Sequence, residues 1–534
     1  MVLFFSFFLF LCHLFLFLFS FFSPFFILEF ESFSLFSFPF SFVFLMDWIS
    51  FLFSSFVIFI SSIIVYYSGY YMFGDFFMSR FILVLILFVF SMILLIFGGN
   101  FFMIMVGWDG LGLVSFCLVV YYSDKDAMVS GIITIMMNRF GDGFLLVSMF
   151  FFNLIGGFNL DFFLFTNWGS FFLLVSFLTK SAQFPFSAWL PAAMSAPTPI
   201  SSLVHSSTLV TAGIYLSIRF SFLFINSFIS FFLMVISLLT LMLGGALANF
   251  EMDFKSIVAM STLSQLGLLF FLISIGSLSM CFFHMISHAF FKSLLFMGTG
   301  SVIISGSQDS RLKGSSLLIS PFIYSSMVVS LFSLMAVPFS VGFFSKDLAL
   351  DFIFGSGVNF LLYFIFLLGS LMTVMYSLRI MFLILPLLYG GGVIMENNYS
   401  KYMYVSFFGG IILTLLWGSF VYLVVLMEDF ILVSFPFKMV GGFLILLGIF
   451  FSGSYVGLSF FYSFLTWFKY LILKLFYFDL FYKFDQVWVE NLIYKSSFVG
   501  LSSLKGFVSL SGEVFWVSFF SIWFVFFIFL SLTT

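Results

Sequence analysis

Residues 177–191 read FLTKSAQFPFSAWLP, and residues 334–347 read LMAVPFSVGFFSKD. In both segments a proline interrupts an apolar run close to a lysine: Lys180 precedes Pro185, and Lys346 follows the second proline. A lysine beside a broken hydrophobic helix is costly unless it lines a polar pathway. Two such segments at corresponding places in two halves of a chain are typical of a transporter core built by internal repetition.

The composition of the whole chain supports a membrane location. It has 534 residues, of which 63% are hydrophobic and 7% are charged, which is typical of a polytopic membrane protein. The net charge of -3 gives no reason to expect nucleic-acid binding. The three cysteines are isolated from one another, and the sequence has no nucleotide-binding glycine motif. We therefore expect no flavin, nucleotide, iron–sulfur cluster or metal in this chain.

About twenty apolar residues cross the hydrocarbon core of a bilayer. By that rule the sequence predicts an all-α chain with about fifteen transmembrane helices. The first apolar run is interpreted as a span, because it lacks the basic start and the cleavage site of a signal peptide. The predicted spans are 2–22, 49–71, 80–98, 101–121, 131–153, 171–190, 199–220, 227–248, 256–276, 279–305, 319–345, 357–388, 403–425, 437–459 and 511–531.

Charges outside the spans predict the orientation and the C-terminal architecture. Loops on the N-terminal side carry Arg80, Lys125, Lys255, Arg311, Lys313 and Lys401, whereas the opposite loops carry only Arg219. This bias places the N-terminus on the inner side of the membrane, which is the matrix in a mitochondrion. Residues 462–509 interleave lysines with aromatic residues, which predicts an amphipathic helix lying along that surface. A disordered basic linker is the alternative.

Asp109 and Lys180 are charged residues within apolar runs. A carboxylate in such a run must be paired, hydrated or protonated. Desolvation favours the neutral form of an amine, whereas a neighbouring carboxylate favours the charged form. A pair that separates and re-forms would therefore act as a proton switch. The alternatives are that Asp109 only ends a short span and that Lys180 extends to the membrane interface.

Histidines provide further candidates for proton transfer. His205 is followed by three hydroxyl residues, which suits a hydrated relay because imidazole titrates near neutral pH. His284, His288 and Lys292 are spaced at i, i+4 and i+8, so a helix places all three on one face. We interpret this stripe as a proton relay. Structural polar packing is the alternative, and a metal site is disfavoured because the adjacent lysine would repel a cation.

Other charges have simpler interpretations. Arg139 and Asp142 are spaced to form an ion pair within one helix. Asp253 and Lys255 are interpreted as boundary charges between a loop and a span. Arg379 is expected to pair across helices, although the sequence names no partner.

The run KSAQFPFSAWLPAAMSAPTPISSLVHSST at 180–208 resembles the signature of the chain 5 family of mitochondrial NADH–ubiquinone oxidoreductase, the antiporter-like subunits of respiratory complex I. Further matches occur in order along the chain, over roughly residues 46–380. They are GWDGLGLVSF at 107–116, NRFGDG at 138–143, KSIVAMSTLSQLGL at 255–268, HMISHAFFKSLLF at 284–296 and GFFSKDL at 342–348.

The resemblance implies two inverted five-helix repeats with discontinuous helices. Additional spans, a lateral helix on the matrix side and a final transmembrane anchor follow the repeats. The implied segments are N-terminal spans at 1–79, the repeats at 80–220 and 221–388, additional spans at 389–461, the lateral helix at 462–509 and the anchor at 510–534.

Roles of single residues also follow from the resemblance. Asp109 stands where the family usually has a glutamate that pairs with the lysine at Lys180, and His205 matches the histidine of the same half-channel. The remaining matches are Lys292 as the central lysine, with His284 and His288 beside it, and Lys346 with Asp347 as the lysine–acid pair leading to the exit.

The implied function is proton translocation across the mitochondrial inner membrane, coupled to NADH oxidation and ubiquinone reduction in other subunits. NADH, FMN, iron–sulfur clusters and ubiquinone are expected in partner subunits. Expected partners are other membrane-arm subunits, especially the chain 4 antiporter-like subunit, accessory subunits, and lipids such as cardiolipin. A stand-alone or multisubunit sodium/proton antiporter subunit is the main alternative, and a structural role with inert charges is another.

Overall fold

The computed structural model describes residues 2–22, 25–35, 38–153, 167–224, 227–304, 308, 321–384, 401–425 and 438–453. The predicted lateral helix at 462–509 and the final anchor at 510–534 lie outside the described residues. Within them, nine helices are long and apolar enough to cross a membrane, and four further apolar helices are shorter. The prediction of a helical, multi-pass membrane fold is therefore confirmed.

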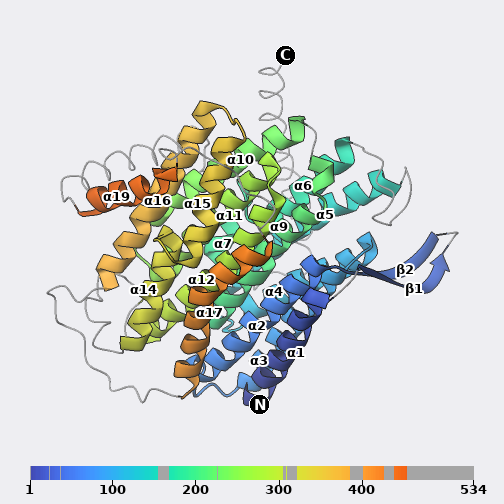
Figure 1. Ribbon diagram of the computed structural model, residues 1–534. Coiled ribbons are helices and arrows are strands. Elements are labelled where there is room, and N and C mark those ends of the chain that lie inside the picture. Colours follow the sequence, from blue (N-terminus) through green and yellow to red (C-terminus); the bar gives the residue numbers. More distant parts are fainter. Residues whose placement is uncertain are drawn as a thin grey trace, which may run out of the picture. The chain divides into compact units, whose positions relative to one another are not determined.

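Long helices make up most of the described chain (Figure 1). Most coincide with the predicted spans to within a few residues. They are α1 (Val2–Phe22), α2 (Trp48–Tyr71), α3 (Met78–Phe97), α4 (Phe101–Val119), α5 (Lys125–Asn153), α6 (Asn167–Lys180), α9 (Leu209–Arg219), α10 (Ser227–Phe250), α11 (Phe254–Ile275), α12 (Leu278–Ile304), α14 (Pro321–Met335), α15 (Val341–Gly355), α16 (Phe360–Ile384), α17 (Lys401–Val425) and α19 (Val440–Gly453).

A β-hairpin between α1 and α2 was not predicted from the sequence. Strands β1 (Phe26–Leu35) and β2 (Phe38–Met46) pair antiparallel, with Phe26 opposite Met46. The hairpin contacts the loop between α3 and α4, where the Gly99 N–H donates to the Val43 carbonyl at 2.8 Å. A side chain at Gly99 would come within 2.6 Å of Leu45, so glycine permits this close approach. The dense phenylalanines of this segment mask the alternation of residues that indicates strands.

The first broken segment interrupts the predicted span 171–190. Helix α6 ends at Lys180, and Ala182 has a positive φ of 55°. Short turns follow, including α7 (Trp189–Ala192) and α8 (Thr198–Ile200), and then the π-helix η4 (Ser201–Thr208), which continues into α9. π-Helical segments occur frequently at functional sites, because they re-aim the side chains of one turn. The expected discontinuous helix is present here.

The second broken segment divides the predicted span 319–345. Helix α14 ends at Met335 and α15 begins at Val341, with left-handed φ values of 64° at Ala336 and 68° at Phe339. Proline in a helix interior removes a backbone donor and clashes with the preceding turn, which explains a break at Pro338. The structure therefore has two shorter helices where the sequence predicted one span.

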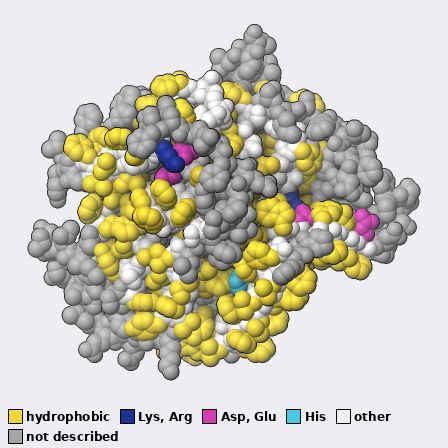
Figure 2. All heavy atoms as spheres, in the orientation of Figure 1, with side chains coloured by type: hydrophobic (Ala, Val, Ile, Leu, Met, Phe, Trp, Pro, Cys, Tyr) yellow, Lys and Arg dark blue, Asp and Glu magenta, His cyan; other side chains and the backbone are white. Residues whose placement is uncertain are grey.

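Helices α11 and α12 lie at the centre of the described bundle. Helix α12 is buried along its whole most apolar stretch and packs against α2, α11, α14 and α17, whereas α1 is largely exposed. The face of the molecule in Figure 2 is mostly hydrophobic, with charged side chains at a few isolated places. Polar groups on the central helices are therefore shielded from lipid by other protein elements.

Candidate functional site

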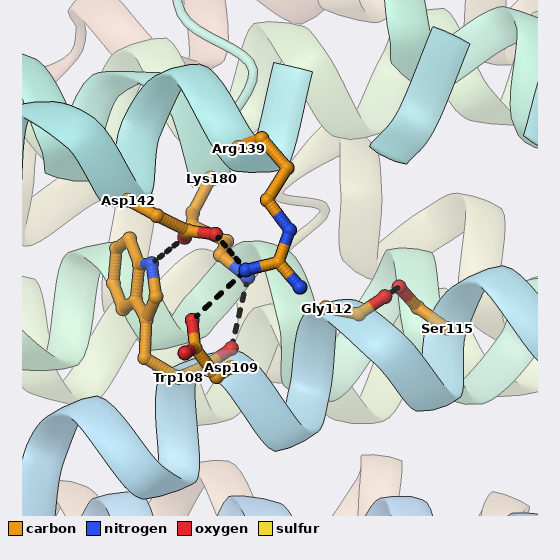
Figure 3. Close-up of polar contacts among 7 residues, drawn as sticks. All are labelled: Trp108, Asp109, Gly112, Ser115, Arg139, Asp142 and Lys180. Atoms are coloured by element: carbon orange, nitrogen blue, oxygen red, sulfur yellow. Dashed lines mark hydrogen bonds and ion pairs between the residues drawn. The ribbon is translucent and has the colours of Figure 1, made fainter. Parts of the chain in front are cut away.

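Lys180 is fully buried at the C-terminal end of α6. Its Nζ donates to the Trp108 carbonyl at 3.2 Å and lies 4.8 Å from the centre of the Trp108 ring (Figure 3). A side chain at Gly112 would place its Cβ 3.5 Å from this amine, so α4 is close to it as well. The lysine is therefore held against α4 by a carbonyl and an aromatic ring.

Two carboxylates lie near this lysine, and an arginine links them. Asp142 accepts from the Trp108 indole N–H at 2.7 Å and from Arg139 Nη1 at 3.2 Å, and Arg139 Nη1 is 3.8 Å from Asp109 Oδ1 (Figure 3). The predicted Arg139–Asp142 pair is confirmed. Both carboxylates therefore belong to the same cluster as Lys180, on either side of Trp108 (Figure 3).

The structure therefore changes the pairing expected around Lys180. The ion pair of Asp109 is with Arg139, and its side chain is 41% exposed, whereas that of Asp142 is 11% exposed. The spacing of Arg139 and Asp142 predicted one helix turn but did not place them at this site. The available signal was the NRFGDG motif itself, which carries two opposite charges in the interior of α5, more than three turns from the charges at the start of that helix.

Neutralising the two carboxylates should have unequal consequences. We expect Asp142→Asn to reduce proton translocation more than Asp109→Asn, because the charge of Asp142 is more buried and therefore less screened by solvent than that of Asp109. Asparagine keeps an acceptor for the Trp108 indole N–H while removing the charge. NADH-driven acidification measured in proteoliposomes compares the two variants. Equal activities, or the larger loss in Asp109→Asn, would contradict this ranking.

His205 lies on the π-helix η4 and is buried. Its ring centre is 6.0 Å from that of Trp189, and the Trp189 indole N–H donates to the Thr179 carbonyl at 3.0 Å. One aromatic ring therefore separates His205 from the end of the helix that carries Lys180. The imidazole lies beside the backbone of Ala193, and neither ring nitrogen has a hydrogen bond of normal geometry within the part of the chain that the structure describes.

His284, His288 and Lys292 are all fully buried on α12. His284 Nδ1 lies 2.9 Å from the Ser345 hydroxyl of α15, and neither ring nitrogen of His288 has a hydrogen-bond partner among the described residues. Lys292 donates to the Ser261 hydroxyl of α11. The described part of the chain contains no group of three His, Cys, Asp or Glu side chains that could hold a metal ion.

Lys346 and Asp347 begin the second turn of α15 and line a small cavity. Lys346 is 8% exposed, and its amine donates to the Leu334 carbonyl of α14. The cavity has a volume of about 30 Å³, and its other walls include Ser370 and Thr373 of α16. Since one water needs about 10–15 Å³ when volume is measured in this way, the cavity has room for about two.

Two other charged side chains, those of Lys255 and Arg379, donate to backbone carbonyls of distant segments. Lys255 is 8% exposed, and its amine donates to the Ala196 carbonyl at 3.2 Å, so the expectation of an ordinary boundary charge is wrong. The close packing of α11 against the broken segment, which the sequence does not reveal, encloses the Lys255 side chain.

Arg379 bridges α16 to the end of α10, where it donates to the Asn249 carbonyl and lies 2.9 Å from the Met252 sulfur. Its expected contact across helices is confirmed.

Broken helices with buried amines inside an apolar bundle are the features of a membrane transport protein. A sequence profile of the NADH:quinone oxidoreductase/Mrp antiporter transmembrane family matches residues 98–373. The chain is 42% identical over 417 residues to NADH-ubiquinone oxidoreductase chain 5 of Anopheles quadrimaculatus, an alignment covering 76% of this chain and 72% of that relative. It is 45% identical over 364 residues to the Aedes aegypti chain 5, covering 66% and 63%. The chain therefore belongs to the NADH:quinone oxidoreductase/Mrp antiporter family, and within it to the relatives called NADH-ubiquinone oxidoreductase chain 5.

Solved structures share the fold. A chain of the Mrp complex from a Dietzia species superposes with a TM-score of 0.73 at 24% identity, over 82% of this chain and 51% of that one. A chain of the membrane-bound sulfane sulfur reductase, an archaeal respiratory membrane complex, gives a TM-score of 0.67 at 19% identity, over 82% and 90%. Both neighbours are members of multisubunit membrane complexes.

Proposed function

We propose that protons cross the mitochondrial inner membrane along a row of buried groups in this chain, from Lys180 through Lys292 to Lys346. The route is based on the family to which the chain belongs. By that membership the chain is a proton-translocating, multi-pass membrane subunit of NADH:ubiquinone oxidoreductase and works beside other membrane subunits. The mitochondrial location and the residues of the route are our proposal.

The observation that supports this route is the type of hydrogen-bond acceptor of each of the three lysine amines. Each amine donates to an uncharged oxygen, and no ion pair among the described residues includes any of them. These oxygens are the Trp108 carbonyl for Lys180, the Ser261 hydroxyl for Lys292 and the Leu334 carbonyl for Lys346. A permanent charge buried without a counter-ion is strongly unfavourable. Amines that alternately gain and lose a proton avoid that cost.

The cluster around Lys180 would start each transfer. A charge displaced in a neighbouring subunit would alter the attraction between Lys180 and the carboxylates Asp109 and Asp142. When that attraction weakens, burial favours the neutral amine, and Lys180 releases its proton towards Lys292. Arg139 joins the two carboxylates, so a movement of either one would be felt by the other.

Buried imidazoles would carry the proton between the lysines. His205 lies between the end of α6 and the central helices, and His284 connects α12 to α15 through Ser345. The ring nitrogens of His205 and His288 make no hydrogen bond of normal geometry to any described residue. This suits groups that exchange a proton, because a purely structural buried polar atom is normally hydrogen-bonded. Lys346 and Asp347 would release the proton through their cavity.

We propose that partner subunits supply the redox chemistry. NADH, FMN, iron–sulfur clusters and ubiquinone would be bound there, and this chain would hold none of them. The chain 4 antiporter-like subunit, accessory subunits and lipids such as cardiolipin would surround it in the membrane. Proton transfer in this chain would then depend on electron transfer elsewhere through electrostatic coupling alone.

Purification of the tagged chain tests this function. We expect it to co-migrate with NADH-oxidising subunits, and the purified complex in liposomes to acidify one compartment when NADH and a quinone are supplied. Sodium should not be required. A chain that purifies without redox subunits and exchanges sodium for protons down a gradient would instead be an antiporter subunit, which would overturn the proposal.

A further inference from the structure

We propose that Tyr376 on α16, together with Ser261 and Ser264 on α11, forms a hydroxyl relay that connects Lys292 to the cavity of Lys346 and Asp347. The proposal rests on the proton route above and adds a branch that does not use the histidines. Tyr376, Ser261 and Ser264 are all buried within the bundle, where a free hydroxyl is expensive.

The first part of the relay consists of hydrogen bonds around Ser261 and Ser264 on α11. Lys292 donates to the Ser261 hydroxyl, one helical turn before Ser264 on α11. The Ser264 hydroxyl lies 2.9 Å from the Ser261 carbonyl and 3.3 Å from the Tyr376 hydroxyl. Ser264 therefore has two alternative partners, and rotation of its hydroxyl switches between them. Ser261 also lies beside the Tyr376 hydroxyl.

The second part runs from Tyr376 to the cavity. Thr373 and Ser370 precede Tyr376 by three and six residues on α16, so the three hydroxyl groups follow one face of that helix. Both Thr373 and Ser370 line the cavity. On α11, Leu268 lines the same cavity one turn beyond Ser264. On each of the two helices, a residue that lines the cavity therefore lies one turn from the relay: Thr373 from Tyr376 on α16, and Leu268 from Ser264 on α11.

Gln265 provides a second, independent observation at this position. Its side chain is fully buried, and neither amide atom has a hydrogen bond of normal geometry among the described residues, although it lies beside the Tyr376 hydroxyl. It follows Ser264 directly and precedes Leu268 by three residues. The amide NH₂ and the amide oxygen of Gln265 therefore remain available to the neighbouring hydroxyl groups. They would stabilise a chain of hydroxyls in which donors become acceptors when a proton is transferred.

The transfer leaves every covalent heavy-atom bond unchanged. The ammonium of Lys292 gives a proton to the Ser261 oxygen while the hydroxyl proton of Ser261 passes to the Tyr376 oxygen, either directly or by exchange through the Ser264 hydroxyl. The phenolic proton of Tyr376 passes in turn towards the cavity, where the neutral amine of Lys346 or the carboxylate of Asp347 accepts it. One proton leaves Lys292 and one arrives at the cavity, so the serine and the tyrosine end uncharged.

Tyr376→Phe in the whole complex tests the relay. Tyr67→Phe is the matched control, because Tyr67 is equally buried but its hydroxyl donates to the Met297 carbonyl, away from the cavity. We expect Tyr376→Phe to slow NADH-driven proton translocation severalfold. The ratio of the rate in H₂O to the rate in D₂O should also increase, since the remaining route must carry every proton. The control should keep both the rate and the isotope effect of the unmodified chain.

Ser264→Ala provides a second test, because it removes the serine hydroxyl that lies 3.3 Å from the Tyr376 hydroxyl. We expect a smaller loss of rate in the same direction, with normal assembly. Normal rates in both Tyr376→Phe and Ser264→Ala would overturn the relay. If Lys292→Met also pumped normally, the failure would instead lie with the proposed proton route, so the two ideas are tested separately.

Discussion

Replacing Lys292 by methionine is expected to abolish proton translocation by this chain. Lys292 is fully buried on α12, and no other amine among the described residues donates to Ser261, so no described group replaces its proton. Methionine has a similar volume and an unbranched chain, so the packing of α12 should survive. Ser261 loses one hydrogen-bond donor, at a cost of about 1 kcal/mol. The measurement is NADH-driven acidification in proteoliposomes.

Lys125→Met is the matched control for this variant. Lys125 is an exposed lysine at the start of α5, and its replacement makes the same chemical change outside the bundle. The control should assemble and pump like the unmodified chain. Full pumping by an assembled Lys292→Met complex would mean that the buried lysine is inert, and it would favour the structural role left open by the sequence.

The sequence was sufficient to predict the breaks in the helices and the amines beside them. Pro185 and Pro338 are local signals, because a proline in the interior of an apolar helix kinks or breaks it. Burial of Lys180 and Lys346 followed from their apolar neighbours along the chain. Each of these predictions depends on residues within about two helical turns, which a single sequence displays directly.

The partners of those amines could not be predicted in the same way. Trp108 and Asp142 are 34 residues apart, and they meet only because α4 packs against α5. Ser261 meets Lys292 across 31 residues, through the contact between α11 and α12. Such pairs depend on how each helix is rotated and tilted. The sequence of a helix that is apolar on every face does not indicate which face is turned towards a neighbour. The sequence therefore predicted the lysines but not the oxygens that hold them.

The β-hairpin at β1 and β2 shows a different limit. Phenylalanine occurs 99 times in the chain, so its presence in residues 26–46 carries little information about burial. Phe26 and Phe30 are exposed in the hairpin, as are many phenylalanines on α1. Where one residue type fills helices and strands alike, hydrophobic periodicity loses its contrast. Only the pairing of the two strands and the hydrogen bond to Gly99 then define the element.

Gly342→Ala is expected to disrupt the second broken segment and with it the stability of the chain. An added Cβ at Gly342 would overlap the Ser333 carbonyl oxygen and lie 2.7 Å from the carbonyl carbon. Because the obstacle is the backbone of α14 and not a flexible side chain, α14 and α15 must separate. Overpacking of this kind typically costs about 1–3 kcal/mol and occasionally more. The separation would also draw the Lys346 amine away from the Leu334 carbonyl, one residue beyond Ser333.

Gly143→Ala is the matched control, since a Cβ at Gly143 on α5 would have no atom within 4 Å. Alanine is favoured over glycine in a helix by up to about 1 kcal/mol, so this variant should be neutral or slightly stabilising. Thermal inactivation of the purified complex and the amount of chain retained in it measure both effects. We expect a lower inactivation temperature and reduced incorporation for Gly342→Ala alone. Equal inactivation temperatures and equal incorporation of the two variants would contradict this prediction. They would show that α14 and α15 can separate without loss of stability, so that their close approach beside Lys346 is not needed for the fold.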